Sequence, residues 1–370
     1  MERASGADSD PGDPVRGPGP RLCSRVFRPG RHPSHGNFTH HRWMQMGARK
    51  SGWKPIELGG LKMTSLQDRL SKVSIADFAR PAAYQSSFRQ FMDSLPSLLA
   101  AEDLRRAAYA ISEAVRNEKT VILGMGAHPI KVGLNPVIIH AIERGLLSGI
   151  ALNGAGIIHD VEIALAGKTS EDVAAHLGKG EFGMVRETAE FIHRTVLKAY
   201  SERTGGLGKA VGEALLMERT PYSDASLLAA AARCNVPVTV HVAIGTDIIH
   251  MHPEMDGAAM GALSQFDFRL FCGLVSTLQH GVFINLGSAV VIPEVFLKAV
   301  SASRNMGFPF DGLTAINMDF LRHYRPLTNV VQRPTMDGGV GINLTGHHEI
   351  MFPLLMAAVL EEIGSVAQEA

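Results

Sequence analysis

The chain has 370 residues, of which 45% are hydrophobic and 19% are charged, a composition typical of a globular protein. Lys and Arg together number 36, as do Asp and Glu, so no excess of charge favours binding to nucleic acid or to a membrane surface. The three cysteines are too few for a disulfide framework and lack the spacing of a zinc site. No apolar stretch is long and uninterrupted enough to span a membrane. We therefore expect a cytoplasmic protein.

The first part of the chain differs in composition from the rest. Residues 1–62 are rich in Pro, Gly, Arg and His and have almost no apolar periodicity, so we predict a disordered N-terminal extension. Residues 63–370 are predicted to form a single α/β domain. This domain begins with a helical part, which we place at residues 64–117.

Short apolar runs alternate with helical segments through the remainder of the chain. Strands are predicted at residues 119–124, 148–152, 236–243, 281–286 and 312–317. Helices are predicted at residues 135–145, 157–166, 223–234, 266–279, 293–305 and 350–363. Strands that alternate with helices in this way imply a parallel sheet covered by helices on both faces.

Two of the predicted strands end in glycine-rich loops. Gly124-Met-Gly126 follows the first strand and Gly154-Ala-Gly156 follows the second. Each lacks the third glycine of the G-x-G-x-x-G dinucleotide fingerprint. Because ligands bind at the carboxyl ends of the strands in open α/β sheets, we expect the functional site to lie beside these loops.

Residues that can transfer a proton follow the second loop and occur again in a polar loop at residues 245–257. His159 and Asp160 belong to the first group and His250 to the second. Histidine titrates near neutral pH and is the commonest general acid or base, so His159 and His250 are candidates for proton transfer. Asp160 is a candidate for orienting the base, and the alternative is that it only favours the N-terminus of a helix.

Histidine pairs suggest a second kind of chemistry. On a strand, His250 and His252 would lie on one face, and such a pair can bind zinc when another ligand such as His347 or His348 completes the site. The His-Glu-x-x-His spacing of many zinc enzymes is absent from the sequence. We therefore predict no metal ligands and keep a histidine-site metal-dependent hydrolase as an alternative.

An ordered series of short motifs resembles the deoxyhypusine synthase family. The series runs through Gly124-Met-Gly-Ala-His128, Asn153-Gly-Ala-Gly-Ile-Ile-His-Asp160, Asn285-Leu-Gly-Ser-Ala289, Thr314-Ala-Ile-Asn317 and Phe352-Pro-Leu-Leu355. Each motif is short, and their common order across residues 119–362 is the specific part of the resemblance.

The resemblance implies a Rossmann-like subunit that binds NAD and assembles as a homotetramer with sites at subunit interfaces. It also implies a reaction in which NAD oxidises spermidine and an enzyme lysine passes the aminobutyl group to an acceptor amine. The positions that it places at the cofactor are Gly126, Ala127, His128, Asn153, Gly154, Gly156, Asp247, Gly287, Ser288 and Asn317. It also places Asp160 at the cofactor, where we expect it to orient the ribose or the catalytic base.

The sequence departs from the family pattern where the chemistry is carried out. The segment 329–339, which corresponds to the lysine motif, contains no lysine, and no lysine follows Lys298. Carboxylates that would hold a cationic polyamine are replaced by histidines, at His159 and His250 among other positions. These changes make the modification of a protein lysine doubtful and indicate a different substrate.

Three hypotheses follow from these observations. The favoured one is an NAD-dependent transferase of the aminoalkyl-transfer class, or an oxidoreductase, that acts on a polyamine or another small amine, with His159, Asp160 and His250 as catalytic residues. The second is the metal-dependent hydrolase. The third is a non-catalytic subunit that assembles with an active relative in a hetero-oligomer.

Overall fold

The computed structural model describes the backbone of residues 56–369 and the side chains of residues 56–364. Most of the extension predicted for residues 1–62 therefore lies outside the described residues. The chain divides into two units, residues 1–70 and residues 71–370. The described part of the first unit contains the short 3-10 helix η1 (Leu58–Gly60). Among the described residues, no helix is long and apolar enough to cross a lipid bilayer.

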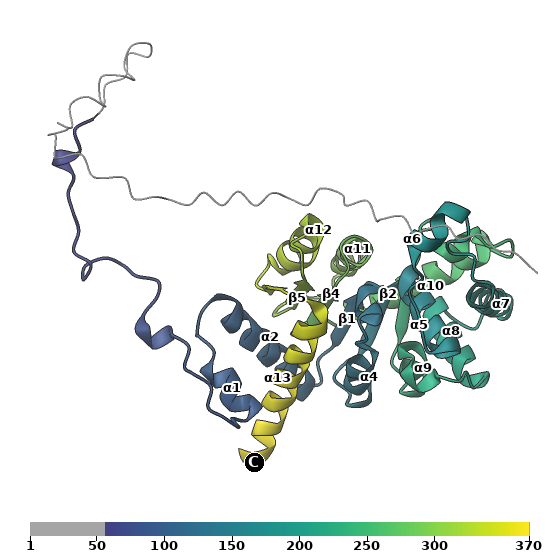
Figure 1. Ribbon diagram of the computed structural model, residues 1–370, viewed down its shortest axis with the longest axis horizontal. Coiled ribbons are helices and arrows are strands. Elements are labelled where there is room, and N and C mark those ends of the chain that lie inside the picture. Colours follow the sequence, from purple (N-terminus) through teal and green to yellow (C-terminus); the bar gives the residue numbers. More distant parts are fainter. Residues whose placement is uncertain (1–55, 370) are drawn as a thin grey trace, which may run out of the picture. The chain divides into compact units, whose positions relative to one another are not determined.

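The second unit is built around a sheet of six parallel strands in the order β3-β2-β1-β4-β5-β6 (Figure 1). The strands are β1 (Val121–Met125), β2 (Gly149–Asn153), β3 (Val238–His241), β4 (Val282–Leu286), β5 (Thr314–Asp319) and β6 (Val340–Thr345). This order is that of Rossmann dinucleotide-binding folds. The predicted α/β class with a parallel sheet is confirmed.

Helices cover both faces of the sheet. They are α1 (Phe88–Ser94), α2 (Leu99–Arg116), α3 (His128–Lys131), α4 (Asn135–Glu143), α5 (Gly154–Ala166), α6 (Val173–His176), α7 (Arg186–Glu202), α8 (Leu207–Met217), α9 (Leu227–Arg233), α10 (Gly257–Val275), α11 (Val291–Asn305), α12 (Tyr324–Pro326) and α13 (His348–Glu369). Helices α2 and α13 lie side by side on one face (Figure 1).

The two faces bury separate cores because successive side chains of a strand point to opposite sides of the sheet. Leu123 and Met125 of β1 belong to the larger core, under α2, α4, α5, α7, α8, α9 and α13. Ile122 of the same strand belongs to the smaller core, under α10 and α11. In the smaller core the rings of Phe283 and Phe296 stack with their centroids 3.6 Å apart. Burial on both faces explains why the strands read as continuous apolar runs.

Two sequence expectations were wrong. Strand β6 was not predicted, because it follows two glycines and begins with exposed residues at the edge of the sheet. The segment that carries His250 is the 3-10 helix η5 (Ile248–Met251), not a strand. His250 and His252 therefore do not form the predicted His-x-His pair on one strand face.

Candidate functional site

The carboxyl ends of β1 and β4 meet at the centre of the sheet, where the strand order reverses. The loop after β1 approaches the loop after β4 closely, and the Gly126 amide donates a hydrogen bond to the Leu286 carbonyl oxygen at 3.2 Å. A Cβ at Gly126 would lie 2.7 Å from the carbonyl oxygen of Gly287. The two loops meet at the reversal point, the position at which open α/β sheets have their ligand-binding crevice.

Gly287 is required for two reasons. Its φ of +66° lies in the left-handed region, and a Cβ there would lie 2.7 Å from Cε1 of His348. The side chain that follows, Ser288, is 4% exposed and its hydroxyl accepts a hydrogen bond from the Ile292 amide at 3.2 Å. The backbone of this loop is therefore bare at Gly287, while Ser288 fixes the start of α11.

Aromatic rings wall the crevice on the β4–β5–β6 side. The ring centroids of His128 and His348 are 5.1 Å apart, and both rings pack against Phe320 at 5.7 Å. Phe320 also stacks on His347. His348 is 1% exposed, and this burial lowers the pKa of its imidazole, although Asp319 at 3.7 Å opposes the effect. The wall is thus formed mainly by aromatic rings, one of which is a buried, neutral imidazole.

A second group of polar residues lies at the carboxyl ends of β2 and β3. Asn153 caps α5, and its side-chain oxygen accepts a hydrogen bond from the Gly156 amide at 3.0 Å. A Cβ at Gly154 would lie 2.0 Å from Oδ2 of Asp247, so the carboxylate rests directly on the bare first turn of α5. Glycine at position 154 is therefore needed for Asp247 to occupy this place.

His159 of α5 belongs to a short hydrogen-bonded chain. Its Nδ1 lies 2.6 Å from the hydroxyl of Thr169, and that hydroxyl donates to the carboxylate of Glu162. Because the hydroxyl proton goes to Glu162, the hydroxyl accepts from Nδ1–H of His159. Neutral His159 therefore carries its lone pair on Nε2. No described residue is hydrogen-bonded to that nitrogen, so it is free to accept a proton.

Glu162 is held in its charged form by this chain. Burial raises the pKa of its carboxyl, but the hydrogen bonds and charge of His159 and the hydrogen bond of Thr169 outweigh burial and leave the pKa below its ordinary value. The Glu162 carboxylate is therefore the acid of the chain that orients His159 through Thr169. The arrangement resembles that of a base whose second nitrogen is oriented by an acid.

His250 has the opposite tautomer. Its Nδ1 accepts hydrogen bonds from the backbone amides of Gly245 and Asp247, each at 3.1 Å. Nδ1 is therefore unprotonated, and the neutral ring carries its proton on Nε2. That Nε2 is buried and has no hydrogen-bond partner among the described residues. A buried N–H group without a partner is costly, and a ligand acceptor would satisfy it.

Asp247 shares its electrostatic environment with both histidines. Burial raises the pKa of the Asp247 carboxyl, and His250, Thr246 and His159 act in the opposite direction. The structure therefore brings together one imidazole that accepts a proton, one that donates, and one carboxyl group of raised pKa. His159 and His250 were predicted from sequence as proton-transfer residues, and Asp247 was predicted as a cofactor contact.

Asp160 occupies a different place from the one predicted. Its carboxylate is fully buried and accepts hydrogen bonds from the Asn135 side chain, the Ser226 hydroxyl and the amides of Leu227 and Leu228. Burial raises its pKa in spite of these bonds. A carboxylate with four protein donors holds the N-terminus of α9 against α4 and α5. This geometry corrects our expectation that Asp160 orients a ribose or a base.

Asn317 also lies inside the protein. Its side chain is 1% exposed, accepts a hydrogen bond from Asn285 and donates one to Asn343, both at 2.8 Å. The three asparagines occupy matching positions on β4, β5 and β6. Because both ends of its amide are used in this ladder, Asn317 stabilises the sheet and does not provide the predicted cofactor contact.

The histidines considered as metal ligands do not converge. His250 and His252 lie beside β2 and β3, where His252 stacks on His193 at 5.6 Å. His347 and His348 follow β6 and pack against Phe320. Within residues 56–369, no three His, Cys, Asp or Glu side chains form a group that could hold a metal ion.

Sequence reasoning missed the residues that join the separate motifs. Neither Thr169 nor Phe320 was singled out from the sequence as a site residue. The sequence offered one indication for Thr169: it lies ten residues after His159, so the rest of helix α5 and the turn that follows can bring the two side chains together. Phe320 directly follows the last residue of β5, the position at which strands of this fold present ligand-binding side chains.

The two loops share one feature with dinucleotide-binding loops. Gly126 and Gly287 let the loops and the ring of His348 pack closely, because a Cβ at either position would lie 2.7 Å from the opposite loop or from that ring. Ala127 between the loops is small, and His128 is exposed. Glycines also permit close packing in the loops of dinucleotide-binding folds.

Comparison with known proteins shows no family for this chain. No family model and no curated protein matches the sequence. Similar solved structures include ArgZ, an arginine dihydrolase from the ornithine-ammonia cycle in cyanobacteria (13% identity, TM-score 0.44, covering 71% of this chain and 33% of ArgZ). The chain thus spans about a third of the length of ArgZ.

Two further structures are similar in length. One is a LOR/SDH candidate from Methanococcus maripaludis S2 (14% identity, TM-score 0.47, covering 72% of this chain and 71% of that one). The other is a candidate deoxyhypusine synthase from Entamoeba histolytica (14% identity, TM-score 0.45, covering 75% and 94%). At this level of similarity none of these proteins indicates what the present chain binds or catalyses.

Proposed function

We propose that the chain is an NAD-dependent enzyme that oxidises a small amine, such as a polyamine, at the carbon next to nitrogen. The observation that carries the proposal is the pair of histidines with opposite tautomers, His159 and His250, around the Asp247 carboxyl. This pair lies at the same edge of the sheet as the glycine crevice of Gly126 and Gly287.

The crevice residues are the ones that would hold the cofactor. The loops that contain Gly126 and Gly287 would lie beside the pyrophosphate, and the exposed imidazole of His128 would donate a hydrogen bond to it. The rings of Phe320 and His348 supply an apolar wall for a planar group. When bound, NAD supplies the hydride acceptor.

The polar residues at β2 and β3 would handle the substrate. In its charged form, Asp247 attracts the substrate ammonium group. Nε2 of His159 removes a proton from the amine nitrogen, and Glu162 stabilises the resulting imidazolium through Thr169. The Nε2–H of His250 donates a hydrogen bond to a second polar atom of the substrate and so fixes its orientation.

The reaction balances with these groups alone. His159 would take one proton from the ammonium nitrogen, and the NAD held by the loop residues would supply the acceptor for the hydride of the neighbouring carbon. An ammonium substrate that loses one proton and one hydride becomes a protonated imine. The family lysine is absent, so the imine reacts with a free amine or with water. The first outcome is an aminoalkyl transfer and the second is an oxidative deamination.

Cofactor binding is tested by calorimetric titration of NAD into the wild-type protein and two variants. His128→Glu places a negative charge beside the crevice and is expected to weaken binding about tenfold or more through repulsion of the pyrophosphate. His140→Glu, on an exposed part of α4, adds the same charge elsewhere and is expected to leave binding unchanged. Absence of NAD binding to the folded wild-type protein contradicts the proposal.

Turnover is tested with NAD and a panel of amines that includes spermidine, putrescine and ornithine. Formation of NADH is followed by its absorbance, and His159→Gln is expected to lower kcat by roughly 10²- to 10⁴-fold, as for loss of a general base. Binding of NAD without turnover of any amine, alone or with an acceptor, favours the non-catalytic subunit instead.

We also infer that the chain assembles as a homotetramer that covers this edge of the sheet. Exposed apolar side chains follow the strand ends there, among them Ile244 (59%), Leu321 (53%) and Tyr324 (71%). Such a group of apolar side chains at a ligand-binding edge is suited to contact with another subunit. Light scattering during gel filtration measures the assembly, and a monomer at micromolar concentration contradicts this inference.

A further inference from the structure

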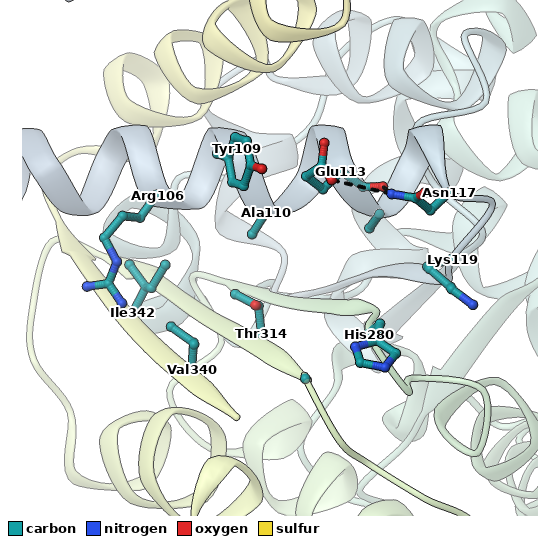
Figure 2. Close-up of a pocket in the computed structure, with 12 residues that line it drawn as sticks. Arg106, Tyr109, Ala110, Glu113, Asn117, Lys119, His280, Thr314, Val340 and Ile342 are labelled. Carbon is teal, nitrogen blue, oxygen red and sulfur yellow. Dashed lines mark hydrogen bonds between the residues drawn. The ribbon is translucent and has the colours of Figure 1, made fainter. Parts of the chain in front are cut away.

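A cavity outside the candidate site lies at the amino edge of the sheet. This cavity of about 500 Å³ is bounded by α2 on one side and by the first residues of β5 and β6 on the other (Figure 2). Its volume is in the range of cavities that hold small molecules. Strand β5 begins here with Thr314 and ends at the opposite edge with Asp319.

Basic groups lie at both ends of the cavity. Figure 2 places Arg106 of α2 at one end and Lys119 with His280 at the other. Lys119 makes no ion pair with a described residue, whereas Arg106 pairs with Asp103 of its own helix at 3.3 Å. Both basic side chains are exposed, so a ligand can bind Lys119 directly and can compete with Asp103 for Arg106.

The acidic side chain of the cavity does not cancel this charge. Glu113 is paired with Arg116 and accepts a hydrogen bond from the side chain of Asn117. It is thus neutralised by a neighbour on its own helix. Lys119 is therefore the cavity's charged side chain without an ion-pair partner among the described residues, and the hydroxyl of Thr314 lies between the two ends (Figure 2).

The walls between the basic ends are small and apolar. Ala110 of α2 faces Val340 and Ile342 of β6 (Figure 2), and Ala114 also lines the cavity. A longer side chain at position 110 would fill it. The ligand that fits such walls has an apolar middle.

His280 is held at the mouth of the cavity by an unusual backbone. Its φ is +57°, in the left-handed region that non-glycine residues rarely adopt, and its amide donates to the Asp311 carbonyl at 2.9 Å. Its ring lies over Gly312, where a Cβ would be 2.2 Å from Nδ1. The strained conformation and the adjacent glycine together fix the ring in place.

We propose that this cavity binds an elongated organic dianion, such as a dicarboxylate, as an effector. One anionic group pairs with Arg106 and the other with Lys119 and His280, and the apolar middle lies against Ala110 and Ile342. The cavity is at the opposite edge from the crevice, so the ligand does not take part in the reaction. The inference does not depend on the proposed function.

The test is calorimetric titration of adipate, suberate, sebacate and dodecanedioate into the full-length protein at constant ionic strength. These longer dicarboxylates are needed because the helical segment from Arg106 to Arg116 already spans about 15 Å. Acetate and inorganic phosphate serve as anions that cannot span the cavity. Affinity is expected to peak at one chain length and to exceed that of acetate and of phosphate by at least about tenfold. Equal binding of all anions, tighter binding of phosphate, or no binding at millimolar concentration overturns the proposal.

Variants locate the ligand. Lys119→Gln and Arg106→Gln are each expected to weaken the best dicarboxylate by about tenfold, and Ala110→Leu is expected to abolish its binding. Lys209→Gln, which removes an exposed lysine from α8, is the matched control and is expected to bind as the wild type does. If Ala110→Leu does not fold, the two charge variants decide the result, and unchanged affinity in both refutes the site.

Discussion

Asp267 offers a quantitative test of how a buried carboxyl limits stability. This residue of α10 is fully buried, and its Oδ2 accepts hydrogen bonds from the amides of Gly208 at 3.0 Å and Val240 at 2.8 Å. Its Oδ1 has no partner among the described residues, and a Cβ at Gly206 would lie 1.6 Å from it. Burial raises the pKa of the carboxyl from 3.8 to about 7, against the effect of these hydrogen bonds.

The sign and size of the effect follow from proton linkage. The folded protein holds the proton up to about pH 7, whereas the unfolded chain releases it near 3.8, so stability is fully present below 3.8 and is lost as the pH rises to about 7. The rise in pKa corresponds to a loss of ~4 kcal/mol across this window. Asp267→Asn removes the titration and keeps an oxygen for the two amides.

The assay is urea unfolding of the wild type and Asp267→Asn at several pH values from about 4 to 8. The free energy of unfolding of the variant relative to the wild type is expected to increase by about 3 kcal/mol between about pH 5 and about pH 8. Other groups titrate equally in both proteins, so they cancel in this difference. Parallel stability curves, with a constant difference, refute the reasoning. Asp224→Asn, at a fully exposed carboxylate, is the control.

Three further predictions concern the candidate site and its support. Asp160→Ala removes the acceptor of four buried hydrogen bonds and is expected to destabilise the fold by about 3–5 kcal/mol in urea unfolding. The control Asp224→Ala is expected to destabilise it by less than about 0.5 kcal/mol. Equal losses of stability in the two variants contradict the structural role of Asp160. Gly154→Ala is expected to displace the adjacent carboxylate and to reduce amine turnover at least about tenfold with the fold intact by circular dichroism, so full activity refutes that contact. Thr169→Val breaks the link between Glu162 and His159 and is expected to lower kcat more than it raises KM and to shift the acidic limb of the pH profile; an unchanged profile excludes the relay.

Local patterns in the sequence were sufficient to predict the secondary structure of most of the core. The apolar runs that became β1, β2, β3, β4 and β5 are continuous because a parallel sheet is buried on both faces. Gly126, Gly154 and Gly287 each follow the end of a strand directly, and the candidate site residues lie at these strand ends. These features depend on neighbours within a few residues, which the sequence displays directly.

Strand β6 and the role of Asp160 could not be predicted from the sequence, because both depend on contacts between residues that are far apart in the chain. β6 lies at the edge of the sheet, so its residues carry little apolar signal and only pairing with β5 defines it. Asp160 follows the glycine loop as a catalytic acid would, yet its partners are contributed by residues 25 to 68 positions away. Without those partners, a structural and a catalytic aspartate cannot be distinguished.

The sequence by itself determined the alternation of strands and helices and the parallel sheet, because both follow from local periodicity, and its glycine positions predicted the edge at which the site is expected. Only the tertiary structure decided which polar groups act together. His159 and His250 are 91 positions apart, and their opposite tautomers are set by Thr169 in one case and by the amides of Gly245 and Asp247 in the other. A tautomer is fixed by the hydrogen-bond partners that the fold supplies, and those partners exist only once the chain has folded.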